Sequence, residues 1–248
     1  MGQGSHSRVV LIGRGNVATH IGKALEDAGY QLLRAGGKHR DAPLPKDADL
    51  YVIAVTDSAI RQVAEEIGDV DGLVVHTAGS VPLDILPQKR RGVIYPMQTF
   101  SRDRELDFRR IPLFVESDTD MDSVQRVASS ISETVYSMDS RRRSVLHLAA
   151  VFCCNFTNRM YGLAHDLLKA EGIPFSVMLP LIDETAAKVH DLAPSKAQTG
   201  PAVRWDEGVM RKHLMMLADS NARDIYELVS KDIHNDKLRL EEDKGNCP

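Results

Sequence analysis

Residues 9–18 read Val-Val-Leu-Ile-Gly-Arg-Gly-Asn-Val-Ala, and this stretch decides the fold. An apolar run ends at Gly13, a second glycine follows at Gly15, and the small residue Ala18 comes three positions later. The first glycine permits a tight turn, the second lets the backbone approach a pyrophosphate, and the small residue lets a helix pack closely on the strand. The N-terminus of that helix offers free N–H groups to an anion. The pattern predicts a dinucleotide-binding turn, with an ordinary glycine turn as the alternative. The predicted binding residues are Gly13, Arg14, Gly15, Asn16, Val17 and Ala18.

The segment 30–40 indicates which dinucleotide binds. NAD-binding sites usually place an acid about 20 residues after the glycines, where it holds the ribose 2′-hydroxyl. This segment contains no acid but carries Arg34, Lys38, His39 and Arg40. A guanidinium can pair bidentately with a 2′-phosphate, which an acid would repel. We therefore expect NADP(H) in preference to NAD(H), with Arg34 and Arg40 as phosphate ligands. NAD(H) stays open as the other cofactor, and a solvated basic loop is the alternative for the segment.

Length, charge and cysteine content exclude several classes of protein. The chain has 248 residues and a formal net charge of −4, which fits one or two domains and argues against nucleic acid as the main partner. No stretch is long and apolar enough for a membrane span, and the first seven residues lack the features of a signal peptide. Cys153, Cys154 and Cys247 form neither a disulfide framework nor a zinc-ligand spacing. We expect a cytoplasmic protein that binds a small-molecule substrate, without a metal, nucleic acid or membrane partner.

The hydrophobic pattern changes in character along the chain. Up to about residue 138, short apolar runs alternate with helical patterns, which is typical of βαβ units and a mainly parallel sheet. Strands are expected at residues 9–12, 31–33, 50–55, 73–76, 93–95, 113–115 and 135–137. Helices are expected from about residues 16, 58 and 120, and then over residues 144–170, 176–192, 206–217 and 221–233. The sequence predicts an α/β Rossmann domain (7–139), an all-α domain (140–240) and a flexible tail (241–248).

Polar residues follow three of the predicted strands, at the sheet edge where a dinucleotide fold binds its ligand. The first group, which we expect to contact the cofactor, consists of Val55, Thr56, Asp57, Thr77 and Gly79. The second group, which we expect to contact the substrate, consists of Ser80, Gln98 and Thr99. Helix caps and turn chemistry are the alternative roles for these residues.

The helical region supplies the candidate catalytic groups. In an uninterrupted α-helix over 144–170, His147 shares a face with Val151, Asn155 and Asn158. An imidazole titrates near neutral pH, so we expect His147 to donate the proton and the two asparagines to orient the substrate. Lys188 is a weaker catalytic candidate. A structural or solvated role is the alternative for each.

Two further positions suggest an anionic ligand. The segment 198–206 contains Gln198, Thr199 and Arg204, and the guanidinium can fork onto a substrate carboxylate. Arg141, Arg142 and Arg143 come where the long helix begins, and positive charge there opposes the helix dipole. That misfit favours an anion as their partner, and a solvated run of charges is the alternative.

Five segments together resemble one family: residues 11–18, 76–80, 95–100, 147–158 and 198–206. The chain resembles the Rossmann-like NADP oxidoreductases with a C-terminal helical domain of the 6-phosphogluconate dehydrogenase type, a group of uncharacterised function related to pyrroline-5-carboxylate reductase. The resemblance implies an α/β Rossmann domain followed by an all-α domain. It also implies a homodimer formed through the helical domain, which completes the active site.

One departure from the wider relatives bears on the chemistry. The resemblance to β-hydroxyacid dehydrogenases aligns Asn155 with their catalytic asparagine, but their lysine four residues earlier is Val151 here. His147, one turn before it, is the nearest substitute. We expect an NADP(H)-dependent oxidoreductase that transfers a hydride between nicotinamide and a small anionic carbonyl or imine substrate. A non-catalytic dinucleotide-binding sensor or scaffold is the alternative, and the missing lysine favours it.

Overall fold

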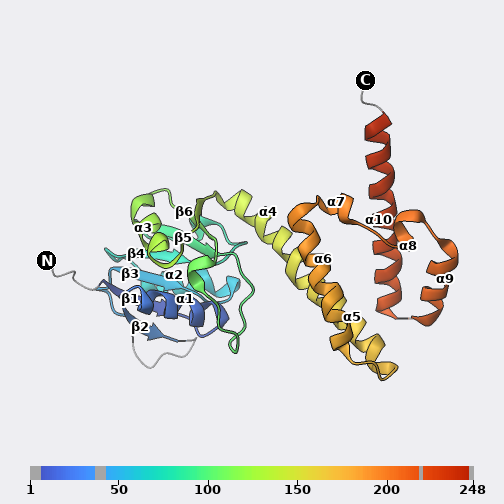
Figure 1. Ribbon diagram of the computed structural model, residues 1–248. Coiled ribbons are helices and arrows are strands. Elements are labelled where there is room, and N and C mark those ends of the chain that lie inside the picture. The colour runs from blue at the N-terminus through green and yellow to red at the C-terminus, as the bar shows by residue number, and fades with distance from the viewer. Residues whose placement is uncertain (1–6, 37–42, 218–219, 246–248) are drawn as a thin grey trace. The chain divides into compact units, whose positions relative to one another are not determined.

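The computed structural model describes residues 7–36, 43–217 and 220–245, and the chain divides into two compact units, Met1–Thr157 and Asn158–Pro248. This division falls later than the domain boundary expected after residue 139. The described part of the first unit contains one seven-stranded sheet (Figure 1). Its strands are β1 (Arg8–Ile12), β2 (Gln31–Ala35), β3 (Leu50–Ile53), β4 (Leu73–His76), β5 (Arg91–Pro96), β6 (Leu113–Glu116) and β7 (Val135–Ser137).

The strand order β2-β1-β3-β4-β5-β6-β7 is that of a Rossmann-like sheet, as predicted. The strands from β2 to β5 pair in parallel, β6 runs antiparallel to β5, and β7 is parallel to β6. The second strand lies on one side of β1 and the third on the other, so the connections reverse direction between β1 and β3. Such a reversal opens a crevice at the carboxyl ends of the strands, where α/β folds bind their ligands.

Helices cover both faces of the sheet. Helices α1 (Asn16–Asp27) and α3 (Met121–Ile131) bury Leu25 and Val124 against one face, and α2 (Ile60–Ile67) buries Ile60 against the other. The central strands β1, β3 and β4 are therefore buried on both sides, which explains why they read as continuous apolar runs. Burying one such aliphatic side chain contributes about 1.5–3 kcal/mol.

The long helical segment begins earlier than predicted and changes its geometry midway. Helix α4 (Ser140–Ala150) begins after Asp139, whose carboxylate accepts a hydrogen bond of 2.8 Å from the backbone N–H of Arg142. A π-helical turn, Val151–Phe156, separates α4 from α5 (Thr157–Ala170). A π-turn takes up more residues per turn than an α-helix. The single face expected for His147, Asn155 and Asn158 assumed an unbroken α-helical period, which this turn interrupts.

The described residues of the second unit are helical, as predicted for an all-α region. After α5 come α6 (Leu179–Asp191), α7 (Pro194–Ala197), α8 (Pro201–Arg204), α9 (Glu207–Met216) and α10 (Asn221–Gly245). Asp206 caps α9 by accepting a 3.1 Å hydrogen bond from the N–H of Val209. Helix α10 packs on α8 and α9 and continues to Gly245, into the region expected as a tail. Among the described helices, none has the length and apolar character to cross a membrane.

Candidate functional site

A cavity of about 610 Å³ lies at the carboxyl ends of the strands in the first unit. Its volume is in the range of small-molecule sites. The dinucleotide turn lines it with residues 12–17, and the segments after β3 and β4 line it with residues 54–57 and 77–79. The remaining lining residues are Ala59, Gln62, Val63, Glu66, Tyr95, Pro96, Gln98, Phe100 and His147. The binding crevice that the glycine motif predicts therefore lies where the connections between strands reverse direction, between β1 and β3.

Glycine serves a different structural purpose at each of the two positions in the turn. Gly13 has a φ of +144°, and a Cβ there would lie 2.0 Å from the backbone oxygen of Ala54. The chain that leaves β1 can therefore pass the end of β3 only because residue 13 has no Cβ. At Gly15, a Cβ would have no described atom within 4 Å, so the space beside this residue is open. Gly15 is also the N-cap of α1, and no side chain of the described residues caps that helix end. The first-turn N–H groups of α1 thus remain available to an anion.

The loop after β5 forms one wall of the cavity and is tied to the dinucleotide turn. The side-chain amide of Asn16 donates to the backbone oxygen of Phe100 over 2.7 Å, and Arg102 donates to the backbone oxygen of Arg14 over 2.6 Å. The ring of His20 lies 5.0 Å from that of Phe100. These partners are 80 or more residues apart in the chain, so nothing in the sequence indicated that they meet.

At another part of the lining, His147 and Tyr95 form a hydrogen-bonded pair. His147 Nδ1 lies 3.1 Å from the Tyr95 hydroxyl oxygen. A Cβ at Gly79 would lie 2.8 Å from Tyr95 Cζ and 2.9 Å from His147 Nδ1, so the missing side chain makes room for both rings. Burial raises the pKa of Tyr95, which keeps the phenol protonated at neutral pH. When this phenol donates to Nδ1, the imidazole proton is on Nε2.

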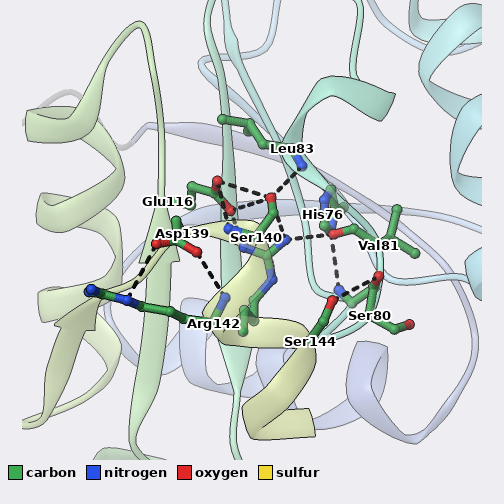
Figure 2. Close-up of polar contacts among 11 residues, drawn as sticks. His76, Ser80, Val81, Leu83, Glu116, Asp139, Ser140, Arg142 and Ser144 are labelled. Atoms are coloured by element: carbon green, nitrogen blue, oxygen red, sulfur yellow. Dashed lines mark hydrogen bonds and ion pairs between the residues drawn. The ribbon is translucent and has the colours of Figure 1, made fainter. Parts of the chain in front are cut away.

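A buried ion pair anchors the helix that carries His147 (Figure 2). The side chain of Arg143 is 1% exposed; it pairs with Glu116 of β6 and donates to the backbone oxygen of Val81. The hydroxyl of Ser140 donates to Glu116 over 2.8 Å and accepts from the N–H of Leu83 over 3.0 Å. Helix α4 is thereby fixed to β6 and to the segment after Gly79.

The ion-pair partners of Arg142 and Arg143 correct one expectation from the sequence. Arg143 pairs with Glu116, and Arg142 pairs with Asp139 over 3.6 Å. The predicted anion ligand for these two arginines is wrong, because carboxylates of the protein itself balance their charge. The sequence could not reveal the partner of Arg143, since it comes from a strand 27 residues earlier.

His76, at the end of β4, is fully buried beside this network. Its Nδ1 accepts a 3.2 Å hydrogen bond from the N–H of Ala78, and its Nε2 has no hydrogen-bond partner among the described residues. Burial, with a further contribution from the charge of Arg143, lowers the pKa of His76 from 6.5 to about 4. The side chain is therefore neutral in the folded protein at neutral pH.

This burial predicts that acid destabilises the fold before the carboxylates titrate. The unfolded chain binds a proton at His76 below pH 6.5, whereas the folded chain binds it only near pH 4. The stability from neutral His76 is therefore complete above pH 6.5 and is lost as the pH falls toward 4, by about 3 kcal/mol in total. Urea unfolding at several pH values measures this slope. We expect His76→Gln to reduce the slope between pH 6.5 and 4, and the exposed His190→Gln to leave it unchanged; an unchanged slope in His76→Gln would contradict the prediction.

The cofactor and substrate residues expected after the strands lie in or beside the cavity. Val55, Thr56, Asp57, Thr77, Gly79 and Gln98 line it. Ser80 lies next to the lining and donates a hydrogen bond to the carboxylate of Asp57. The N–H of Thr99 donates to the side-chain oxygen of Gln98 over 2.8 Å. Ala18 is buried behind the turn, 3.4 Å from the position of a Cβ at Gly13. Asn155 lies in the π-helical turn.

Arg34 forms an ion pair within the protein. Its guanidinium pairs with Glu26 of α1 over 2.9 Å and lies against Gly22, where a Cβ would be 2.7 Å from Arg34 Nη1. This pairing argues against the role predicted for Arg34 as a phosphate ligand, because its charge is balanced by a carboxylate of the protein. Arg40 lies outside the described residues, as do Lys38 and His39.

The other expected substrate residues belong to the second unit. Asn158 lies in α5 and the partly exposed Lys188 in α6. Gln198 donates to the backbone oxygen of Thr199 over 3.1 Å, and Arg204 ends α8. Their roles stay predictions. In the described residues, no group of three or more His, Cys, Asp or Glu side chains is arranged to hold a metal ion.

Comparisons with known proteins give both a family and a fold. A family model described as a domain of unknown function, DUF2520, matches residues 111–233. The crystal structure of a "putative NADP oxidoreductase" from Bacteroides fragilis shares 45% identity with this chain, with a TM-score of 0.84 over 92% of this chain and 98% of that chain. No curated protein matches the chain.

Two more distant structures share the fold. An imine reductase from Streptomyces aurantiacus is 14% identical, with a TM-score of 0.67 over 92% of this chain and 93% of that chain. A 1-pyrroline-5-carboxylate reductase from Streptococcus pyogenes is 15% identical, with a TM-score of 0.57 over 91% of this chain and 98% of that chain.

Proposed function

The chain belongs to the family of the Bacteroides fragilis "putative NADP oxidoreductase", and from this premise we propose that it is an NADP(H)-dependent oxidoreductase acting on a small anionic carbonyl or imine. The observation that carries the proposal is the composition of the cavity. One part of its wall is the glycine turn, and another is the hydrogen-bonded pair of Tyr95 and His147. A binding site for a dinucleotide therefore adjoins a pair of groups able to move a proton.

The residues of the turn fit a dinucleotide. The open space beside Gly15 and the uncapped N-terminus of α1 among the described residues suit the close approach of a pyrophosphate. Thr56, Asp57 and Thr77 supply hydroxyl and carboxylate groups along the same wall. When bound, a nicotinamide supplies or accepts the hydride of the reaction.

His147 would hold the proton that the substrate gains or loses. Its Nδ1 lies 3.1 Å from the Tyr95 hydroxyl oxygen, which leaves Nε2 as the atom that can exchange a proton with the substrate. Imidazole is suited to general acid–base catalysis near neutral pH. For an imine or carbonyl substrate, the charged imidazolium would donate its Nε2 proton to the nitrogen or oxygen and become a neutral imidazole; in oxidation the neutral imidazole would accept that proton at Nε2.

Substrate binding would use the polar groups that the sequence predicts for it. Gln98 lines the cavity and offers a side-chain amide. Ser80 and Thr99, which are hydrogen-bonded to the lining residues Asp57 and Gln98, offer hydroxyl groups. We assign Asn155 and Asn158 to orientation of the substrate, and Arg204, with Gln198 and Thr199, to its anionic group, because guanidinium binds carboxylate bidentately. Lys188 is a second candidate for proton transfer.

We further propose that the protein is a homodimer in the cytoplasm. Large apolar side chains are more than half exposed on α4, the π-helical turn, α6 and α10, among them Val145, Phe152, Leu181 and Leu228. Large apolar side chains exposed on helices in this way are typical of an association surface. The assignment to the cytoplasm rests on the three cysteines, which form no disulfide framework.

Nucleotide titration tests the proposal. We expect the protein to bind NADPH more tightly than NADH when nucleotide fluorescence is followed. Gly15→Val serves as the matched variant: its side chain enters the open space, so the fold is retained and NADPH binding weakens at least about tenfold. NADPH oxidation is then measured with a panel of keto acids and cyclic imines. Binding without turnover of the panel would favour the sensor or scaffold function, and failure to bind either nucleotide would overturn the proposal.

A further inference from the structure

At the end of β2, the structure places an arginine that differs from the one expected there. Arg14, between the two glycines of the turn, lines the cavity. At Gly36, the residue after β2, a Cβ would lie 2.0 Å from Arg14 Nε and 2.8 Å from Arg14 Cζ. The guanidinium of Arg14 therefore lies directly against the backbone of Gly36. Any larger residue at position 36 would displace it.

We propose that Arg14 selects NADP(H) over NAD(H) by pairing with the 2′-phosphate of the adenosine ribose. This assignment rests on the proposed function and names the residue that sets its cofactor specificity. Dinucleotide folds bind the adenosine ribose near the end of the second strand, where an acid holds the 2′-hydroxyl in NAD-binding sites. Here the backbone of Gly36 and the guanidinium of Arg14 share that place. The arginines expected from the sequence follow the start of β2, whereas this charge comes from the turn after β1.

The backbone of Arg14 is held in place while its side-chain charge stays available. Arg102 donates to the backbone oxygen of Arg14 over 2.6 Å and so fixes the residue from the loop after β5. Within the described part of the chain, no carboxylate pairs with the guanidinium of Arg14. Arg34, by contrast, is paired with Glu26 over 2.9 Å. A guanidinium binds phosphate bidentately, whereas the 2′-hydroxyl of NAD(H) offers it no charge. Arg14 therefore strengthens the binding of NADP(H) and not that of NAD(H).

The test compares two arginines of the same region. Calorimetric titration with NADPH, NADH, adenosine 2′,5′-bisphosphate and ADP measures binding without requiring a substrate. We expect Arg14→Ala to weaken NADPH and the bisphosphate by about 10- to 100-fold and to change NADH and ADP by less than about threefold. Arg34→Ala, the matched control, should change all four by less than about threefold, because its guanidinium is already paired with Glu26.

A second variant moves the charge without removing it. Gly36→Ala places a methyl group where Arg14 Nε lies, so the arginine must shift, and we expect NADPH binding to weaken at least about fivefold while NADH is unaffected. Unchanged NADPH affinity in Arg14→Ala would overturn the assignment and leave the oxidoreductase proposal intact. Equal losses for NADPH and NADH would also overturn it, since they would assign Arg14 to the pyrophosphate. If the unmodified protein binds neither nucleotide, the proposed function fails first.

Discussion

Replacing His147 with alanine is expected to lower kcat by about 10²- to 10⁴-fold, with the Kd of NADPH changed by less than about threefold. The imidazole lines the cavity, and its Nδ1 lies 3.1 Å from the Tyr95 hydroxyl. Its loss removes the group proposed to hold the transferred proton but none of the residues of the glycine turn. Steady-state kinetics with a substrate from the keto acid and imine panel measures kcat, and nucleotide fluorescence measures the Kd.

Two further variants separate catalysis from packing. Tyr95→Phe keeps the ring in place and removes the hydroxyl bonded to Nδ1, so we expect a smaller loss of about tenfold in kcat and a shifted pH profile. His165→Ala, at an exposed histidine of α5, should change neither. Unchanged turnover in His147→Ala would remove His147 from the mechanism and favour Lys188 as the proton-transfer group.

Replacing Arg143 with methionine is expected to lower the free energy of unfolding by about 3–5 kcal/mol. The arginine is buried, and its loss leaves the carboxylate of Glu116, which is 16% exposed, without its counter-charge. Because this pair fixes α4 to β6, we also expect His147 to be less well positioned and kcat to fall. Urea unfolding of the full chain measures the first effect.

A neighbouring arginine provides the control. Arg142→Ala removes an ion pair with Asp139 in which both side chains are more than half exposed, so we expect a loss below about 1 kcal/mol. In the double variant Arg143→Met with Glu116→Gln, no charge is left unpaired. Its loss should be smaller than the sum of the single losses by at least about 1 kcal/mol. Additive losses, or a loss in Arg143→Met as small as that of Arg142→Ala, would contradict the prediction.

The local hydrophobic pattern of the sequence was sufficient to predict much of the fold. Strands β4 (Leu73–His76) and β7 (Val135–Ser137) have the bounds that the sequence predicts, and α1 begins at Asn16 as expected after the second glycine. These elements were predictable because apolar periodicity and glycine positions act over a few residues. The π-helical turn Val151–Phe156 was not, since an α-helical period gives no warning of it.

The candidate site likewise has parts that the sequence predicts and parts that it does not. The lining by the glycine turn and by the segments after β3 and β4 followed from the strand ends, because parallel strands bring their carboxyl ends to one edge. The pairing of Tyr95 with His147 was not predictable, since 52 residues separate them and Gly79 must leave room for both. The choice between Arg34 and Arg14 was equally hidden: both are arginines near one motif, and only their neighbours differ.

The sequence by itself determined the order of the elements, the position of the dinucleotide turn and the family to which the chain is similar. These depend on spacing between near neighbours. The tertiary structure alone decided which charges are balanced internally and which remain available: Arg143 pairs with Glu116, Arg34 pairs with Glu26, and Arg14 lies over Gly36. The physical reason is that a charge acts through the groups packed around it, and the fold draws those groups from distant parts of the chain.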